Sequence, residues 1–408
     1  MTLHARPIKN GQTSPACRAA ENERPTLRSA TNRRDFSRAG RVIHVASSHR
    51  MGLTAQETEL ALAYKNLNAF DLLVVTGENE QVAGSFRRLS EHGVRNAIIP
   101  GFDEHRDFSR LVRQFAEQCT AFEPQVVTVN TNWQLLVAGV ARHFCKSQFN
   151  ILYTVHGFRN NQKLKSYVAR FLIGALLFLF ADTINAPTSY VAKKFRALRR
   201  KIVSIPLGED PLFFMESKQI QSDLTLRMVF PGQFREGKNQ DLLIYALRDY
   251  IDQTGDRDVA LYLPGSGELL PAAQELASTL GLSEFVIFPG QLNRNEILDL
   301  YNKCQIAVVP ANSETFGHCI AEPLVLQRIL ITRRVGIAID VIKDGENGFL
   351  FESKDDLVTR LKQIRATSFS DLSEISRKAG ETGRLFRWEN IASRHYKEIF
   401  NNFSQVDL

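Results

Sequence analysis

Short apolar runs alternate along this chain with longer segments whose apolar positions recur at helical spacing. In the first half the runs lie at 42–46, 72–75, 97–99, 126–129, 151–155 and 183–186. In the second half they lie at 227–230, 259–263, 285–288, 306–309, 329–332 and 348–351. Buried runs that alternate with amphipathic helices are typical of parallel sheets covered by helices on both faces. The pattern predicts an α/β protein with two Rossmann-like domains.

The domain boundaries follow from length and composition. A chain of 408 residues exceeds what one core comfortably fills, and the segment 205–211 carries two prolines and a glycine, which suits a connection between domains. We expect a first domain over 41–205 and a second over 206–385. Residues 386–408 are predicted to form a helix that packs back on the first domain, and Phe386 and Trp388 are predicted to anchor the C-terminal stretch onto a domain surface. Residues 1–40, rich in Arg, Asn, Thr, Ser and Pro, are predicted to be a disordered leader.

Charge is distributed unevenly between the two halves. Residues 41–205 carry 21 basic and 12 acidic side chains, whereas residues 206–408 carry 22 and 29. A basic first half attracts polyanions such as membrane lipids, a lipid diphosphate or nucleic acid, although a solvated surface explains the charge equally well. Because no nucleic-acid-binding module or aromatic-basic interleaving is present, we expect no nucleic-acid partner.

Cysteine usage and hydropathy bear on the compartment. The five cysteines are widely separated and lack metal-ligand spacing, which favours a reducing, cytoplasmic location without disulfides or bound zinc. Residues 1–40 contain no long apolar stretch of the kind that a signal peptide needs, which disfavours secretion. The most apolar segment, 171–181, is about half of the roughly 20 residues that span a bilayer. We interpret it as a buried helix, while the preceding Lys163, Lys165 and Arg170 leave open a helix on the inner face of the membrane.

Candidate chemistry lies directly after the apolar run 306–309. Glu314 and Glu322 stand eight positions apart around Phe316 and Gly317, at the place where an α/β sheet presents ligand-binding groups. Such a pair alone is explained by a solvated helix face. Pro323 predicts that a helix begins there, which would place Glu322 in its first turn. A carboxylate at that position can accept hydrogen bonds from two ribose hydroxyls.

Two glycine-containing loops in the same domain support a phosphate-binding role. The loop 230–240 follows the first strand of the domain and leads into a helix, so its amides together with Lys238 or Arg235 can neutralise a diphosphate. The loop 263–268 contains Gly265 and Gly267, which permit close backbone approach. Each loop alone is compatible with an ordinary βα connection. Together with the carboxylate pair they indicate a nucleotide sugar as the ligand.

These residues, in this order, resemble the retaining glycosyltransferases of the GT-B fold, family 4 type, also called group 1. The resemblance covers most of residues 41–403, and the family's Glu-x7-Glu signature stands here as Glu314 and Glu322. It implies that Glu314 contacts the transferred sugar and that backbone amides at Phe316 and Gly317 bind its hydroxyls. Glu322 would bind the ribose. The resemblance also places Lys238 on the diphosphate.

The first domain carries weaker parts of the same resemblance. His156, in the strand end 153–157, resembles the histidine that the family places near the reacting centre. Gly52 lies in the first turn, where the family usually has two glycines near the donor phosphate and the acceptor. Gln233 stands where the family has an arginine, so Arg235 would have to turn inward to complete the cationic clamp. The resemblance implies two domains that face a central cleft, retention of anomeric configuration, no metal and no cofactor.

We therefore expect a hexosyltransferase-like enzyme that moves a sugar from a nucleoside diphosphate sugar to a hydroxyl acceptor. The acceptor would be a glycan or a lipid-linked glycan in cell-surface polysaccharide or glycolipid synthesis, with peripheral contact to an anionic membrane left open. The alternative is a noncatalytic nucleotide-sugar or glycan-binding protein that kept the fold, as Gln233 suggests. A dinucleotide oxidoreductase is disfavoured because no first strand leads into a complete GxGxxG followed by an acidic residue.

Overall fold

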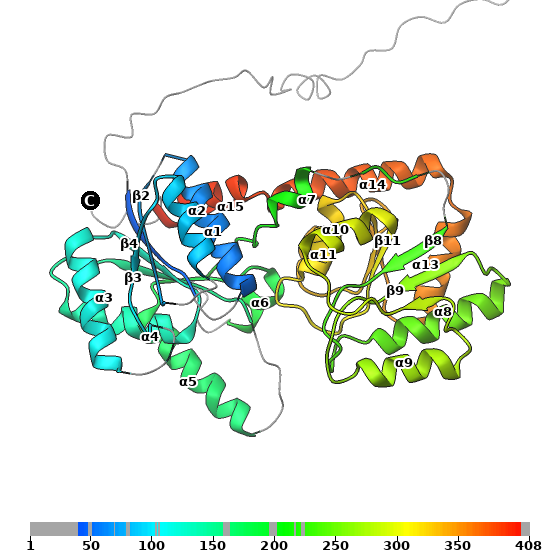
Figure 1. Cartoon of the computed structure of the whole chain (residues 1–408), viewed down its shortest axis with the longest axis horizontal. Helices are drawn as coiled ribbons and strands as arrows, with labels where there is room; N and C mark the ends of the chain where they lie inside the picture. Colours follow the sequence, from blue (N-terminus) through cyan, green and yellow to red (C-terminus); the bar gives the residue numbers. More distant parts are fainter. Residues whose placement is uncertain are drawn as a thin grey trace, which may run out of the picture. The chain divides into compact units, whose positions relative to one another are not determined.

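Two parallel sheets, each with helices packed against it, make up the described part of the chain (Figure 1). The structure is a computed structural model that describes residues 40–47, 51–68, 70–78, 82–102, 104, 107–157, 164–195, 202–215, 218–221 and 225–400. The prediction of two Rossmann-like domains is confirmed. The predicted leader lies outside the described residues except for Gly40, and so do residues 401–408 of the predicted C-terminal helix.

The first domain is built on a seven-stranded parallel sheet in the order β3-β2-β1-β4-β5-β6-β7. Its strands are β1 (Gly40–Val45), β2 (Phe70–Thr76), β3 (Arg95–Ile98), β4 (Val126–Val129), β5 (Asn150–Thr154), β6 (Thr183–Asn185) and β7 (Ile202–Val203). Six of them match the predicted runs. The seventh strand, with only two residues, is too short to produce a recognisable hydrophobic pattern.

Helices pack on both faces of this sheet. They are α1 (Met51–Asn66), α2 (Ala83–Glu91), α3 (Phe108–Phe122), α4 (Asn132–Ala141), α5 (Leu164–Phe180) and α6 (Ser189–Lys194). Because side chains alternate along a strand, Ile43 and Val45 pack in the core beneath α3 and α4, whereas Val42 packs in the core beneath α1. Figure 1 shows α1 and α2 on the side of the sheet away from α3 and α4.

Helix α5 differs from the expectation for its sequence. The segment 171–181 does form most of a helix, but only one face of it packs on the domain, through residues such as Leu177, which is fully buried. Phe171, Leu172 and Leu179 are between 61% and 76% exposed. The interpretation as a buried helix is therefore wrong for the outer face, because apolar content alone does not specify how many sides of a helix are covered.

The second domain has a six-stranded parallel sheet in the order β10-β9-β8-β11-β12-β13. Its strands are β8 (Leu226–Val229), β9 (Val259–Tyr262), β10 (Val286–Ile287), β11 (Ile306–Val309), β12 (Ile329–Thr332) and β13 (Phe349–Leu350). The helices are α7 (Pro211–Met215), α8 (Gln240–Thr254), α9 (Leu270–Thr279), α10 (Arg294–Lys303), α11 (His318–Val325), α12 (Ala338–Val341), α13 (Lys354–Ala366) and α14 (Phe369–Gly383). All six strands coincide with predicted runs to within one or two residues.

The chain returns to the first domain after α14. Phe386 is fully buried in the core of the second domain, whereas Trp388, which begins α15 (Trp388–His395), packs with residues of β1 and α1. The indole of Trp388 lies against Gly208 in the connection between the domains, where a Cβ atom would meet the ring at 2.3 Å. A residue with a side chain at position 208 would therefore displace either the connection or α15.

Helix α15 is joined to the first domain by buried polar side chains. A 2.6 Å hydrogen bond joins Tyr64 Oη of α1 and His395 Nδ1, and His44 Nδ1 of β1 lies 2.5 Å from Thr128 Oγ1 of β4. Burial lowers the pKa of His44 to about 4 and that of His395 to about 3, and the charges of His44 and Arg394 add to the effect on His395. Both imidazoles are therefore neutral in the folded protein at neutral pH.

These two histidines predict a specific dependence of stability on pH. Between pH 6.5, which is the pKa of histidine in the unfolded chain, and about pH 4, the unfolded chain binds protons that the folded histidines do not bind. The free energy of unfolding therefore has its full value above pH 6.5 and decreases as the pH falls below it. Each histidine contributes a slope of about 1.4 kcal/mol per pH unit in that window. In urea unfolding, the free energy of unfolding of a His395→Gln variant should depend on pH less steeply than that of the parent protein, by that amount. His143→Gln, at an exposed site, is the control, and parallel curves for His395→Gln and the parent protein would contradict the assignment.

Candidate functional site

The predicted donor-binding residues follow β8 and β11, the two strands between which the order of the second sheet reverses. Loops that follow two such strands diverge and leave room for a ligand at the carboxyl edge of the sheet. Here backbone and side-chain contacts join the two loops: Asn312 N donates to Gly237 O at 2.9 Å, and Asn239 Nδ2 donates to Pro310 O at 3.0 Å. The fold therefore holds Lys238 and Glu314 in fixed relation.

Lys238 and Glu314 form an ion pair with a distance of 2.5 Å between Lys238 Nζ and Glu314 Oε1. Each side chain is 13% exposed, so the pair is largely shielded from water. Burial opposes the ammonium form of Lys238, but Cys319 and Glu314 outweigh it, and the pKa of Lys238 is raised. The lysine is thus a fixed positive charge in a region of low dielectric constant, where it acts strongly on nearby anions.

Two glycines determine the backbone around Glu314 and Phe316. Gly317 has a φ of 93° and caps α11, and Gly336 has a φ of 51°. A Cβ atom at Gly336 would lie 2.3 Å from Phe316 O and 2.9 Å from Glu314 Cβ, so only glycine permits this approach. Ile337 N donates to Phe316 O at 2.7 Å, and the Phe316 ring is buried against Phe386.

Gly265 and Gly267 have a packing role in the structure. Their φ values are 146° and 148°, and a Cβ atom at either residue would overlap the backbone of the loop that contains Lys238. Gly232 N donates to Pro264 O at 3.0 Å and Phe234 N donates to Ser266 O at 2.9 Å. The glycines thus let the two loops lie backbone to backbone, and direct contact of Gly265 with a donor stays a prediction.

The start of α11 corrects the prediction made from Pro323. The helix begins at His318, five residues earlier, because Gly317 O accepts from Ile320 N and Ala321 N and so forms the first turn. Pro323 lies inside the helix, where it cannot donate to Cys319 O. The helix ends at Val325, soon after this missing bond. Glu322 is therefore in the second turn and not at the positive helix end.

Both carboxylate oxygens of Glu322 already have protein partners. Arg294 Nη1 donates to Oε1 at 3.0 Å and Tyr301 Oη donates to Oε2 at 3.1 Å. Burial, together with the Glu322 charge, raises the pKa of Tyr301 well above its ordinary value, so the phenol keeps its proton. A carboxylate has about four acceptor positions, so the predicted ribose contact of Glu322 is compatible with these partners and stays a prediction.

Cys319 shows that the three predicted side chains belong to one cluster. Burial raises the pKa of its thiol well above the ordinary value, the carboxylates of Glu314 and Glu322 raise it further, and Lys238 opposes them. Its Sγ lies 3.8 Å from Glu314 Oε1. The sequence places these residues up to 84 positions apart, and the fold gathers them around one buried sulfur.

His318, which follows Gly317 directly, connects this cluster to the rest of the chain. Its Nδ1 lies 2.7 Å from Glu209 Oε1 in the connection between the domains, and its Nε2 lies 2.6 Å from the side-chain amide of Gln56 in α1. Burial lowers the pKa of His318, but Glu209 and Glu322 together raise it by more, so the net shift is upward. Burial raises the pKa of Glu209, and His318 opposes that shift. The pair is therefore mutually stabilised.

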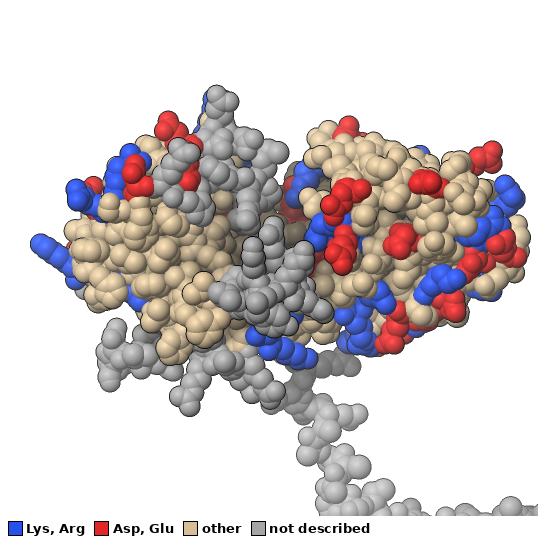
Figure 2. All heavy atoms as spheres, turned by 90° about the horizontal axis from the view of Figure 1, so that it is seen from below, with Lys and Arg blue, Asp and Glu red and all other residues tan. Residues whose placement is uncertain are grey.

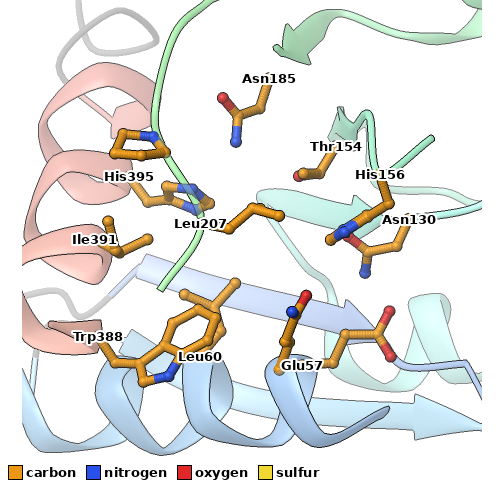
Figure 3. A pocket seen from close by; sticks show the side chains of 12 residues that line it. Glu57, Leu60, Asn130, Thr154, His156, Asn185, Leu207, Trp388, Ile391 and His395 are labelled. Atoms are coloured by element: carbon orange, nitrogen blue, oxygen red, sulfur yellow. The ribbon is translucent and has the colours of Figure 1, made fainter. Parts of the chain in front are cut away.

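His156 lines a small pocket at the carboxyl ends of the first-domain strands, and most of the exposed lining of this pocket is apolar (Figure 3). Its Nε2 is 3.1 Å from Asn130 Oδ1, and the pocket is formed by the ends of β4, β5 and β6 with α1 and α15. In Figure 3 His156 and Asn130 lie beside Glu57, whose Oε2 accepts from Ser47 N at 2.6 Å. Gln56 lines this pocket and also contacts His318. Gln56 thus lies between the pocket that contains His156 and the start of α11.

The remaining predicted residues are placed as follows. Arg235 and Gln233 are both exposed, and the Arg235 charge lies near enough to oppose the upward pKa shift of Lys238. Gly52 falls in the first turn of α1. The donor-binding roles of Arg235, Gly52, Phe316 and Gly317, and the catalytic roles of His156 and Glu314, stay predictions.

Sequence reasoning missed the partners of the buried carboxylates, namely Arg294, Tyr301, His318 and Glu209. Asn293 and Glu296 form a capping box that is visible in the sequence and marks the start of α10, but it does not show that Arg294 points to Glu322. A histidine immediately after the Phe-Gly pair was the available signal for His318.

Comparison with known proteins identifies the second domain. Residues 216–384 match the family model of the glycosyl transferases group 1. The putative glycosyltransferase EpsD of Bacillus subtilis is 25% identical over 316 residues, which are 72% of this chain and 80% of that protein. An uncharacterised glycosyltransferase of Methanocaldococcus jannaschii, MJ1178, is 28% identical over 167 residues, or 40% of this chain and 44% of that protein. The matched segment thus covers less than half of the length of MJ1178 and most of the length of EpsD.

Solved structures extend the likeness to both domains. The structure of Alr3699/HepE from Anabaena in complex with UDP matches with a TM-score of 0.70 and 18% identity, covering 90% of this chain and all of that one. A glycosyltransferase from Rickettsia africae matches with a TM-score of 0.68 and 17% identity over 90% of this chain. Identities this low establish the fold alone. The second domain thus matches the glycosyl transferases group 1 over residues 216–384, and the two domains together have the GT-B fold.

Proposed function

We propose that the chain transfers a sugar from a nucleoside diphosphate sugar to a hydroxyl acceptor. The observation that carries the proposal is the shielded Lys238–Glu314 ion pair, which lies in one cluster with the buried Glu322 inside the family-matched domain. The related Alr3699/HepE has structures in complex with UDP and with UDP-glucose, which supports a nucleoside diphosphate sugar as the donor.

The proposed chemistry follows from the charges in the cluster. Departure of a nucleoside diphosphate leaves negative charge on the diphosphate, and a preorganised cation stabilises that charge without reorganisation during the reaction. Lys238 is such a cation, and in our proposal a bound diphosphate competes with Glu314 for its ammonium group. Glu314 is then placed to contact the transferred sugar. Retention of configuration and independence of metal ions are further parts of this proposal.

The acceptor belongs to the first domain in this proposal. His156 is positioned by Asn130 in a pocket at the carboxyl ends of β4 to β6, and Gln56 connects the rim of this pocket to His318 beside the donor residues. An acceptor hydroxyl near His156 would meet the donor sugar near Glu314. We propose a glycan or lipid-linked glycan as acceptor, in the synthesis of cell-surface polysaccharide or glycolipid.

A direct test is release of nucleotide from a panel of UDP-, GDP- and ADP-sugars by the purified chain, with and without an acceptor extract. We expect release from one or more donors and a large decrease in the Lys238→Ala variant. A noncatalytic binding protein would bind nucleotide without releasing it from any donor, and that outcome, with intact binding, would overturn the enzyme assignment.

Lys238→Ala should weaken binding of the preferred nucleoside diphosphate roughly 10- to 100-fold, the loss expected for one charge-assisted contact. Calorimetric titration measures the change. Lys238→Arg keeps the charge and should lose less. Lys362→Ala removes a lysine that contacts Gln253 on the far helices α13 and α8, and serves as the control. Equal affinities for Lys238→Ala and Lys362→Ala would exclude Lys238 from the diphosphate site.

Glu322→Gln should reduce discrimination between a nucleoside diphosphate and its 2′-deoxy analogue, because the amide accepts ribose hydrogen bonds less strongly than the carboxylate. The parent protein is expected to prefer the ribonucleotide by about tenfold, corresponding to one hydrogen bond to a charged group. The measured quantity is the ratio of the affinities for the ribonucleotide and its 2′-deoxy analogue. A loss of packing at Arg294 would weaken both affinities, so a change in their ratio reports on ribose binding. An unchanged ratio in the variant would show that Glu322 has only the structural contacts to Arg294 and Tyr301.

A further inference from the structure

The two domains do not share a hydrophobic core in the described part of the chain. One buried apolar cluster belongs to the second domain and includes Leu207 of the connection. The clusters of the first domain include Ile205 of the connection, with Trp388 and Ile391 of α15. Figure 2 shows a recess between the domains, with acidic and basic side chains at its edge on the side of the second domain. Relative motion of two such domains is the default expectation unless specific contacts align them.

Polar contacts join the two domains, and two of these contacts end directly after Glu314. Thr188, the N-cap residue of α6, donates from Oγ1 to Thr315 O at 3.0 Å. Gln56 Nε2 of α1 lies 2.6 Å from His318 Nε2. Thr315 and His318 flank the Phe-Gly pair that follows the carboxylate. The position of the first domain is therefore tied to the segment that carries Glu314.

His318 also contacts the connection between the domains. Its Nδ1 lies 2.7 Å from Glu209 Oε1, and Glu209 is almost fully buried. The backbone of Glu209 is held as well, because Glu209 N donates to Phe386 O at 2.9 Å. His318 is thus the residue at which the first domain, the connection and the start of α11 meet.

The chemistry of these side chains suits a bridge. A carboxylate is an acceptor, so Nδ1 of His318 is the donor in the bond to Glu209. The amide of Gln56 has both a donor and an acceptor. It can pair with Nε2 of the neutral imidazole through its nitrogen and with Nε2 of the imidazolium through its oxygen. The contact is therefore available in either protonation state of His318.

We propose that His318 is a positioning residue for sugar transfer, which aligns the first domain with Glu314 through its contacts to Gln56 and Glu209. The predicted donor residues of the cluster all belong to the second domain, so binding of the nucleotide does not need this alignment. Transfer does need it, because the acceptor is assigned to the first domain and a misplacement of about 1 Å can lower a rate roughly 100-fold. This role rests on the proposed sugar transfer, whereas the contact itself does not.

The test compares variants of the full chain. Gln56→Met keeps the length and the helix propensity of the side chain and removes its hydrogen bond. Gln56 is only partly buried, so folding should be retained. His318→Asn keeps a donor toward Glu209 and no longer reaches Gln56. Gln274→Met, at an exposed site of α9, is the matched control.

The kinetic readout is transfer from the preferred donor. The kcat of the Gln56→Met variant should fall roughly two- to tenfold, as expected for the loss of one hydrogen bond. Its KM for the donor and its affinity for the nucleoside diphosphate should equal those of the parent chain. The Gln56→Met/His318→Asn variant should lose no more than the worse single variant, because both changes remove the same contact. Additive losses, or a nucleotide affinity that falls together with kcat, would overturn the positioning role.

Hydrogen exchange separates this proposal from the proposed function. Amides over residues 313–322 should exchange faster in Gln56→Met than in the parent chain, although the change lies in the other domain, and Gln274→Met should exchange as the parent does. If the parent chain released no nucleotide from any donor, the proposed function would fail, and faster exchange in Gln56→Met would still establish that His318 aligns the domains. Equal exchange in the parent chain and Gln56→Met would overturn the alignment itself.

Discussion

The cluster of Lys238, Glu314 and Glu322 around Cys319 depends on a close backbone approach that two glycines allow. Gly317 turns the chain into α11 with a φ of 93°, and Gly336 lies against Phe316 O and Glu314 Cβ without space for a side chain. These contacts fix where α11 begins. Once that point is fixed, the positions of Glu314 before the helix, His318 at its start and Glu322 in its second turn follow from helical geometry. A steric constraint thereby sets the electrostatic arrangement of the site.

Each charged side chain in this arrangement has a partner of opposite sign. Lys238 is paired with Glu314, Arg294 with Glu322, and His318 with Glu209. Removing such groups from water costs several kcal/mol per ion unless they are compensated, so the pairs maintain one another. A ligand with a diphosphate and a ribose would enter a network that is already satisfied. Binding of that ligand would then replace Glu314 as the partner of Lys238. At Glu322 it would add hydrogen bonds to a carboxylate that already has protein partners.

The first domain contributes surfaces of two different kinds. At its carboxyl edge, His156 and Asn130 line a small pocket that α15 helps to form. Its outer layer of helices is apolar along α5 and basic in the surrounding sequence. The passage of the chain from Phe386 in one core to Trp388 in the other anchors α15 beside that pocket.

The sequence by itself determined the two sheets and the placement of Lys238 and Glu314. Short apolar runs are sufficient to locate parallel strands, and loops after such strands meet at one edge. It did not determine the start of α11, because the turn at Gly317 begins that helix and Pro323 lies inside it. Nor did it show the partners of Glu322, the packing role of Gly265 or the exposed face of α5. Those features are decided by which surfaces pack together, and residues distant in sequence meet only after the elements have assembled.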